Sequence, residues 1–199
     1  MNVTKKRAMM IGIFILAAAL ISFYFDNEIV NAVSQSRNSI LNEFFFGITF
    51  VSSEIIVFFF LTSLFLWSER KRKWIFPLWV SLGLSTLASF ALKIIVQRQR
   101  PFQAGIVSTF QILEKASMSL WNFSFPSFQA MLAFCAIPIL SKEFPKLKKA
   151  WIIFAFFVAF SRVYFGLHFM SDVIAGGIIG YLIGMLVIMH EKKINFWRK

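Results

Sequence analysis

Long apolar runs, each separated from the next by a polar or basic segment, extend along almost the whole chain. The runs cover residues 8–25, 44–67, 75–96, 124–140, 150–165 and 170–189. An α-helix rises about 1.5 Å per residue, so roughly 20 apolar residues cross the ~30 Å hydrocarbon layer of a bilayer. The pattern therefore predicts an all-α integral membrane bundle of six transmembrane helices, which forms a single domain over residues 1–199.

The segments between the runs predict less regular structure. Residues 26–42 are polar with short apolar interruptions, which is typical of a loop. Between residues 106 and 120, apolar side chains recur at three- and four-residue steps, beginning with Ile106, Phe110 and Leu113. This spacing predicts a short amphipathic helix that lies on the membrane surface.

Two of the apolar runs contain charged residues. Ser52, Ser53 and Glu54 interrupt the second run, and Lys93 lies near the end of the third. An acid within a membrane helix is a functional candidate by default. We nevertheless expect Glu54 to have a structural role, with Ser52, Ser53 or a neighbouring helix as its partner.

The composition agrees with a membrane protein and argues against a nucleic-acid partner. Of 199 residues, 58% are hydrophobic and 15% are charged, yet the net charge is +12. A nucleic-acid partner would require a basic face on a soluble module, whereas the basic residues here form short clusters beside the apolar runs. They are better interpreted as topology signals. The single cysteine, Cys135, lies within an apolar run, where we expect it to pack.

The basic clusters predict how the chain is oriented. Fifteen of the 21 Lys and Arg residues lie at the N-terminus, after the second and fourth runs, and in the C-terminal tail. By the positive-inside rule these four segments are cytoplasmic, so both termini are cytoplasmic. The remaining basic residues then lie near the outer face of the plasma membrane.

One stretch, from Ser161 to Asp172, concentrates the side chains that chemistry requires. His168 and Asp172 are four residues apart, so a helical turn would place them on one face, where the carboxylate accepts the imidazole N–H. The only other histidine, His190, lies in the charged tail. A reaction that needs an imidazole must therefore use His168, with Asp172 as the group that orients it.

Two further clusters are expected at the same outer end of the bundle. Lys93 and Arg100 are two helical turns apart. Ser127 offers a hydroxyl at the N-terminus of the fourth predicted helix, where free backbone N–H groups favour an anion. Together with Arg162 and His168, these residues predict a phosphate site with an in-line nucleophile.

The three clusters resemble the type 2 phosphatidic acid phosphatase superfamily, the lipid phosphate phosphatases related to vanadium haloperoxidases. Its motifs read Lys-x6-Arg-Pro, Pro-Ser-Gly-His and Ser-Arg-x5-His-x3-Asp. The first matches at Lys93, Arg100 and Pro101, and the third matches at Ser161, Arg162, His168 and Asp172. The resemblance covers nearly the whole chain and implies a phosphohistidine intermediate on His168, with phosphate held by Lys93, Arg100, Ser127, the Phe128 backbone and Arg162.

The second motif departs from the family pattern, since it reads Pro126-Ser127-Phe128-Gln129. In the family, the histidine at the place of Gln129 is taken to protonate the leaving group. A glutamine amide donates a hydrogen bond but delivers no proton at neutral pH. Gln129 therefore remains a candidate contact to the leaving group, and the bulk of Phe128 restricts the approach of phosphate.

The missing acid indicates which substrate suits this site. General acid catalysis contributes ~10²–10⁴ in rate, and an alkoxide needs that help to leave. A monophosphate that leaves from a diphosphate has a second pKa near ~6 and departs as a stable anion. We therefore expect a metal-independent phosphatase, without a cofactor, that acts on a polyprenyl diphosphate.

Other functions remain open at this point. A phosphatidic acid or phosphatidylglycerophosphate phosphatase would use the same site on a monoester. Loss of the motif histidine is also compatible with a catalytically inactive protein that binds lipid phosphates. A small transporter or channel is the weakest alternative, because the charges gather at one face instead of spanning the membrane.

Overall fold

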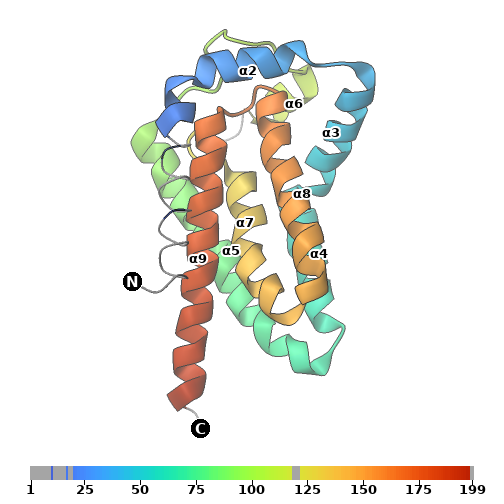
Figure 1. The fold of residues 1–199 in the computed structure, drawn as a ribbon, viewed down its shortest axis with the longest axis vertical. Helices are drawn as coiled ribbons and strands as arrows, with labels where there is room; N and C mark the ends of the chain where they lie inside the picture. The colour runs from blue at the N-terminus through green and yellow to red at the C-terminus, as the bar shows by residue number, and fades with distance from the viewer. Residues whose placement is uncertain (1–9, 11–16, 18–19, 118–121, 198–199) are drawn as a thin grey trace.

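The computed structural model describes residues 10, 17, 20–117 and 122–197 (Figure 1). Within these ranges every regular element is a helix. In chain order the elements are α2 (Asp26–Gln35), α3 (Ser39–Val51), α4 (Glu54–Leu66), the 3₁₀ helix η1 (Glu69–Trp74), α5 (Ile75–Val96), α6 (Gln111–Ser117), α7 (Phe128–Glu143), α8 (Pro145–Tyr164) and α9 (Met170–Trp197). The all-α prediction is therefore confirmed.

Helix α7 is the centre of the bundle and packs against α5, α8 and α9. Its side chains from Ala130 to Ala133 and from Cys135 to Leu140 are buried. The contact with α9 is close because Gly176, Gly180 and Gly184 face it. A Cβ atom at these glycines would collide with the backbone oxygens of Ser127, Met131 and Cys135, respectively. The repeat of glycines thus serves helix packing within the bundle, and Cys135 has the packing role expected of it.

The second predicted span is broken. Helices α3 and α4 meet at Ser52 and Ser53 with a bend of 62°. Ser52 donates its hydroxyl to the Thr49 carbonyl at 3.1 Å, a bond that competes with the backbone ladder and favours a helix end. Glu54 therefore begins α4 instead of lying deep in one helix, and its carboxylate attracts the charge of Arg162 on the neighbouring α8.

The prediction of a loop over residues 26–42 is wrong. Residues 26–35 form α2, which lies across one end of the bundle above α8 and α9 (Figure 1). The segment is amphipathic, with Val30 fully buried and Ile29 and Val33 packed beside it. Its few apolar positions resemble loop composition, although at helical spacing they suffice to dock one face.

The described residues contain two helical stretches that are long and apolar enough to cross a membrane, Glu69–Val96 and Met170–Glu191. The bent pair α3 and α4 makes a third if it counts as one span. Residues 8–18, most of the first predicted span, lie largely outside the described ranges. The six-span layout and the cytoplasmic termini remain predictions.

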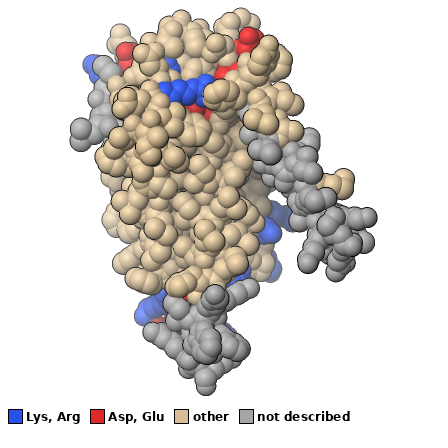
Figure 2. All heavy atoms as spheres, turned by 90° about the vertical axis from the view of Figure 1, so that its left-hand side faces the viewer, with Lys and Arg blue, Asp and Glu red and all other residues tan. Residues whose placement is uncertain are grey.

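The surface suits a bilayer. Figure 2 shows a broad area of uncharged side chains between charged residues near the upper and lower ends. Large apolar side chains are exposed on several helices, including Phe59, Phe76, Ile95 and Leu186. The predicted amphipathic helix after Pro101 is present as α6, which begins later than expected, at Gln111, with Leu113 buried and Ile112 exposed.

Candidate active site

The short connection between α8 and α9 carries His168. Gly166 adopts a left-handed backbone conformation, with φ of +69°, that a side chain would strain. The backbone N–H groups of Leu167 and His168 then donate to the Arg162 carbonyl at 2.9 and 3.3 Å. This tight turn buries His168 against the first turn of α9, where Asp172 lies.

His168 and Asp172 are neighbours, but the imidazole N–H does not go to the carboxylate. Nδ1 of His168 lies 3.9 Å from Oδ2 of Asp172, whereas it lies 2.7 Å from the backbone oxygen of Ser124. Since a carbonyl oxygen only accepts, the proton is assigned to Nδ1. Nε2 therefore keeps its lone pair and can act as a nucleophile.

Ser124 is a site residue that the sequence did not single out. Its hydroxyl donates to Oδ2 of Asp172 at 2.5 Å, while its carbonyl holds the ring of His168. The backbone N–H of Phe169 also donates to Oδ2, at 2.8 Å. Ser124 thus links the imidazole to the carboxylate, and only its place just before Pro126 could have drawn attention to it.

The structure places three buried cations around His168. Lys93, Arg100 and Arg162 expose 3%, 8% and 3% of their surface. Nη1 of Arg100 lies 3.3 Å from Nε2 of His168 and 3.1 Å from the Leu167 carbonyl, and Lys93 donates to the Phe123 carbonyl. A cluster of buried cations of this kind favours a bound anion.

The charges around His168 determine its protonation. Burial lowers the pKa of His168 well below its ordinary value, and the positive charges of Arg100, Lys93 and Arg162 add to this effect. Burial lowers the pKa of Arg100 to about 10, so that its guanidinium stays charged at neutral pH. A neutral imidazole thus lies beside the charged guanidinium of Arg100, as a nucleophile that attacks phosphate requires.

Ser127 stands at the N-cap of α7 and offers unused hydrogen-bonding capacity. Its hydroxyl is buried and has no hydrogen-bond partner among the described residues. The first N–H groups of α7, which begins at Phe128, have no side-chain cap. A buried orphan hydroxyl beside a helix N-terminus is suited to an anion.

Gln129, on the first turn of α7, holds Arg162. Its side-chain oxygen accepts a hydrogen bond from Nη1 of Arg162. Nη2 of Arg162 donates to the Thr49 hydroxyl, and Nε donates to the Ser161 hydroxyl at 3.2 Å. Gln129 thus orients a cation, and it brings no ionisable proton to the site.

Within the described ranges, no group of three or more His, Cys, Asp or Glu side chains gathers to hold a metal. The clustered charges are mainly cations, and the acids Asp172 and Asp26 pair with Arg98. Arg98 lies between Lys93 and Arg100 in the sequence, at a position where the family motif specifies no residue. The side chains of the site are therefore suited to bind an anion. Its described acids are already paired with Arg98 and form no cluster of metal ligands.

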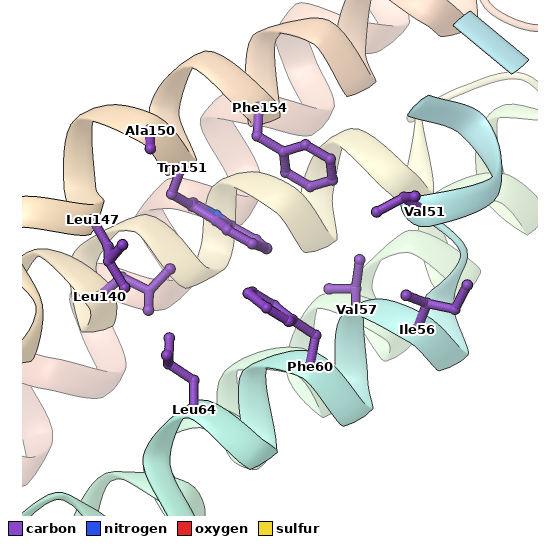
Figure 3. A pocket seen from close by; sticks show the side chains of 10 residues that line it. All are labelled: Val51, Ile56, Val57, Phe60, Leu64, Leu140, Leu147, Ala150, Trp151 and Phe154. Atoms are coloured by element: carbon purple, nitrogen blue, oxygen red, sulfur yellow. The ribbon is translucent and has the colours of Figure 1, made fainter. Parts of the chain in front are cut away.

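An apolar groove opens between α4 and α8 (Figure 3). The α8 residues that line it precede Arg162 by eight residues or more, so the groove lies below the site. It has a volume of about 280 Å³, and apolar side chains line it. The rings of Phe60 on α4 and Trp151 on α8 face each other with centroids 6.1 Å apart. Val51, two residues after Thr49, lies at the end of the groove nearest the break between α3 and α4.

Comparisons with known proteins agree with this geometry. The PAP2 superfamily model matches residues 74–195. Phosphatidylglycerophosphatase B of Bacillus subtilis is 30% identical over 187 residues, which cover 87% of each chain. An undecaprenyl-diphosphatase of Sulfolobus acidocaldarius is 32% identical over 133 residues, which cover 65% of this chain and 61% of that protein.

Solved structures resemble the fold as well. The crystal structure of a transmembrane PAP2-type phosphatidylglycerolphosphate phosphatase from Bacillus subtilis has a TM-score of 0.70 and 26% identity, over 94% of this chain and 96% of that chain. Aquifex aeolicus LpxE has a TM-score of 0.65 and 25% identity, over 83% and 95% of the two chains. The chain therefore belongs to the PAP2 superfamily and is a membrane lipid phosphatase.

Proposed function

We propose that this phosphatase hydrolyses a polyprenyl diphosphate to the monophosphate at the outer face of the plasma membrane. The observation that carries the proposal is the position of Gln129, which binds Arg162 and has no proton to give. A site without an acid at this place suits a leaving group that departs as a stable anion. The terminal phosphate of a lipid diphosphate is attached to such a group.

In the first step, Nε2 of His168 attacks the terminal phosphorus. The new N–P bond replaces the bridging P–O bond, and the lipid monophosphate leaves with the electron pair of that bond. Lys93, Arg100 and Arg162, with the hydroxyl of Ser127 and the N–H of Phe128, hold the phosphoryl oxygens as charge develops on them. Ser124 keeps the Nδ1 proton in place, so that Nε2 is always the attacking atom.

In the second step, water attacks the phosphorus of the phosphohistidine. The N–P bond breaks, inorganic phosphate leaves and the imidazole returns to its neutral form. Asp172 lies 3.9 Å from Nδ1 and stabilises the positive charge that the ring carries while it is phosphorylated. All groups that these two steps require are side chains or backbone of this chain, so turnover is expected to continue in EDTA.

The energetic argument for a diphosphate rests on the missing acid. A general acid lowers the barrier by roughly 3–5.5 kcal/mol, the equivalent of ~10²–10⁴ in rate. A monoester must expel an alkoxide without that help, whereas a diphosphate need not. The apolar groove beneath the site supports a lipid substrate, because a hydrocarbon tail is favourably buried against apolar side chains.

A second candidate is a monoester, and one comparison favours it. The curated relative that matches over 87% of the chain is named phosphatidylglycerophosphatase B. For this chain to hydrolyse a phosphatidylglycerophosphate or phosphatidic acid efficiently, water or lipid would have to supply the leaving-group proton. A protein that only binds lipid phosphates is disfavoured by the hydrogen bond from Nδ1 of His168 to Ser124, which leaves the lone pair on Nε2, the atom that would attack phosphorus.

Phosphate release from a panel of lipids tests the proposal. Purified protein in detergent with EDTA should release phosphate from undecaprenyl diphosphate much faster than from the matched monophosphate or phosphatidylglycerophosphate. Faster release from the monoesters would favour the second candidate, and no release from any lipid would favour a binding protein. Labelling of Ser108→Cys from outside intact cells tests the outward orientation.

A further inference from the structure

Arg98 lies between two carboxylates that come from opposite ends of the chain. Its Nη1 donates to Oδ1 of Asp172 at 2.8 Å, and its Nη2 donates to Oδ2 of Asp26 at 2.7 Å. Both carboxylates are buried, with 0% and 3% of the residue surface exposed. The guanidinium also lies over the ring of Phe169, 3.9 Å from its centroid, so its orientation is fixed on several sides.

Asp26 connects helix α2 to the beginning of α9. Its Oδ1 accepts the backbone N–H of Ser171 at 3.0 Å, and its Oδ2 accepts the Ser171 hydroxyl. That hydroxyl in turn accepts from Nη1 of Arg98 at 2.8 Å. The first residue of α2 thus supplies the acceptor for a free N–H group in the first turn of α9, next to Asp172.

Arg98 also reaches the imidazole through its backbone. Its carbonyl accepts the N–H of Ser124 at 2.7 Å, and Ser124 in turn holds both the ring of His168 and Oδ2 of Asp172. Arg98 therefore fixes Asp172 with its side chain and Ser124 with its main chain. Within the described part of the chain, Arg98 forms no hydrogen bond with Nε2, so it acts on His168 only through these two neighbours.

The charges of the three residues decide what Asp172 does for the ring. A lone Arg98 would neutralise Asp172 and weaken its attraction for a positive imidazole. Because Asp26 balances Arg98, the three side chains together keep a net charge of −1 beside His168. The same balance avoids an unpaired buried charge, which is costly in a protein interior.

We propose that Asp26 and Arg98 are positioning residues of the phosphatase, in which Arg98 fixes Asp172 and Asp26 balances Arg98 so that Asp172 keeps its negative charge for His168. This inference rests on the proposed function, since it concerns the charge that the phosphohistidine carries. It makes helix α2 part of the catalytic arrangement. It also goes beyond the matched motifs, which include neither residue.

Charge balance and simple anchoring of α2 predict different results for a double variant. Asp26→Asn changes the net charge from −1 to 0, and Arg98→Gln changes it to −2. Asp26→Asn with Arg98→Gln restores −1. Two purely structural defects would add or stay equal, whereas charge balance makes the double variant faster than either single variant.

The experiment measures phosphate release from undecaprenyl diphosphate, with the number of intact sites counted by calorimetric titration with orthovanadate. We expect kcat per binding site to fall about tenfold in each single variant, the equivalent of ~1.4 kcal/mol, and to recover at least threefold in the double variant, an estimate of about half that free energy. The Kd of orthovanadate should change less than about twofold. If Asp26→Asn does not fold, the comparison of Arg98→Gln with the double variant still distinguishes charge balance from simple anchoring of α2.

Val30→Ala is the matched control, because Val30 is buried on the same face of α2 and is uncharged. It loosens α2 without touching the charges and should leave kcat per binding site unchanged. An equal loss of kcat per binding site in Val30→Ala, or no recovery of it in the double variant, would overturn the inference. Turnover of the diphosphate by the wild type would still support the proposed function in that case. A wild type that releases no phosphate from any lipid overturns both.

Discussion

The end of the bundle that carries His168 and the half below it are stabilised by different interactions. At the His168 end, buried polar groups are held one by one, by carbonyls such as that of Ser124 and by carboxylates such as Asp172. In the lower half, α7 meets α9 through glycines and apolar side chains. Single hydrogen bonds orient the reacting groups at one end, and close contact keeps the helices together at the other.

The difference predicts separable effects of mutation. A substitution at the His168 end should change turnover more than stability, because each group there acts on a particular atom. A substitution at the glycine contact should change stability more than turnover per folded molecule. Substitutions at His168, Gly180, Gln129 and Phe60 test this separation, in decreasing order of expected effect.

Removal of the proposed nucleophile, His168, should have the largest effect. His168→Ala should lower phosphate release by ~10⁴-fold or more, by analogy with the loss of other catalytic nucleophiles. The melting temperature in detergent should change little, because Ala fits the space and Asp172 keeps its contacts to Ser124 and Arg98. Retention of most wild-type activity by purified His168→Ala would show that another group attacks phosphorus.

A change at the glycine contact should act on stability. In Gly180→Ala the new Cβ would collide with the Met131 backbone, and the free energy of unfolding should fall by about 1–3 kcal/mol. Gly83→Ala is the matched control, since its Cβ would have no atom within 4 Å and Ala favours a helix by roughly 0.5–1 kcal/mol. Thermal unfolding in detergent measures both, and equal destabilisation would contradict the close contact.

The sequence predicted the helices of the lower half better than the contacts of the site. Helix α5 begins and ends as its apolar run indicated, because a long run at helical spacing decides the structure locally. The break after Ser52 and the short helix α2 were not predicted, since each depends on packing against distant residues. Both elements also contribute to the surroundings of the site. Thr49, near the end of α3, accepts a hydrogen bond from Arg162, and Asp26, on α2, accepts one from Arg98.

Within the site, motif spacing named the residues that the structure places around His168. It did not name their partners. Spacing suggested that Asp172 accepts the imidazole N–H, whereas Ser124 does so from 44 residues away. Asp26 is even more distant in sequence, and its contacts with Ser171 and Arg98 arise only when α2 folds over the bundle. A periodic pattern carries no signal of such contacts.

The third prediction changes the residue that distinguishes this site from the family motif. Gln129→His restores an acid near the leaving group and should raise monophosphate turnover about tenfold, which is less than the ~10²–10⁴ that general acids contribute in evolved sites. Diphosphate turnover should rise much less, because its leaving group needs no proton. Gln129→Leu is the control, since it loses the acceptor for Arg162 and should slow both substrates alike. Equal acceleration of both by Gln129→His would mean that Gln129 limits binding and not leaving-group departure.

The fourth prediction concerns the groove. The proposed substrate would bind at both ends of the comparison, with its phosphates at the His168 end and its tail in the groove of the lower half. Phe154 is eight residues before Arg162 on α8, which places it about 12 Å below the phosphate site. A short tail would not reach the ring of Phe60, whereas a long tail would lie against it. Phe60→Ala should therefore lower kcat/KM for undecaprenyl diphosphate about two- to fivefold, the equivalent of ~0.4–1 kcal/mol of lost apolar contact.

The same variant should leave kcat/KM for geranyl diphosphate unchanged, because that tail ends above the groove. Phe59→Ala is the matched control, since Phe59 directly precedes Phe60 on α4 but is 66% exposed and does not line the groove. It should leave both substrates unaffected. A loss with the short tail as great as with the long one would mean that Phe60 acts on the fold of α4 and not on the lipid. No loss with either substrate would mean that the groove holds bulk lipid, and the tail of the substrate would then lie elsewhere on the apolar surface.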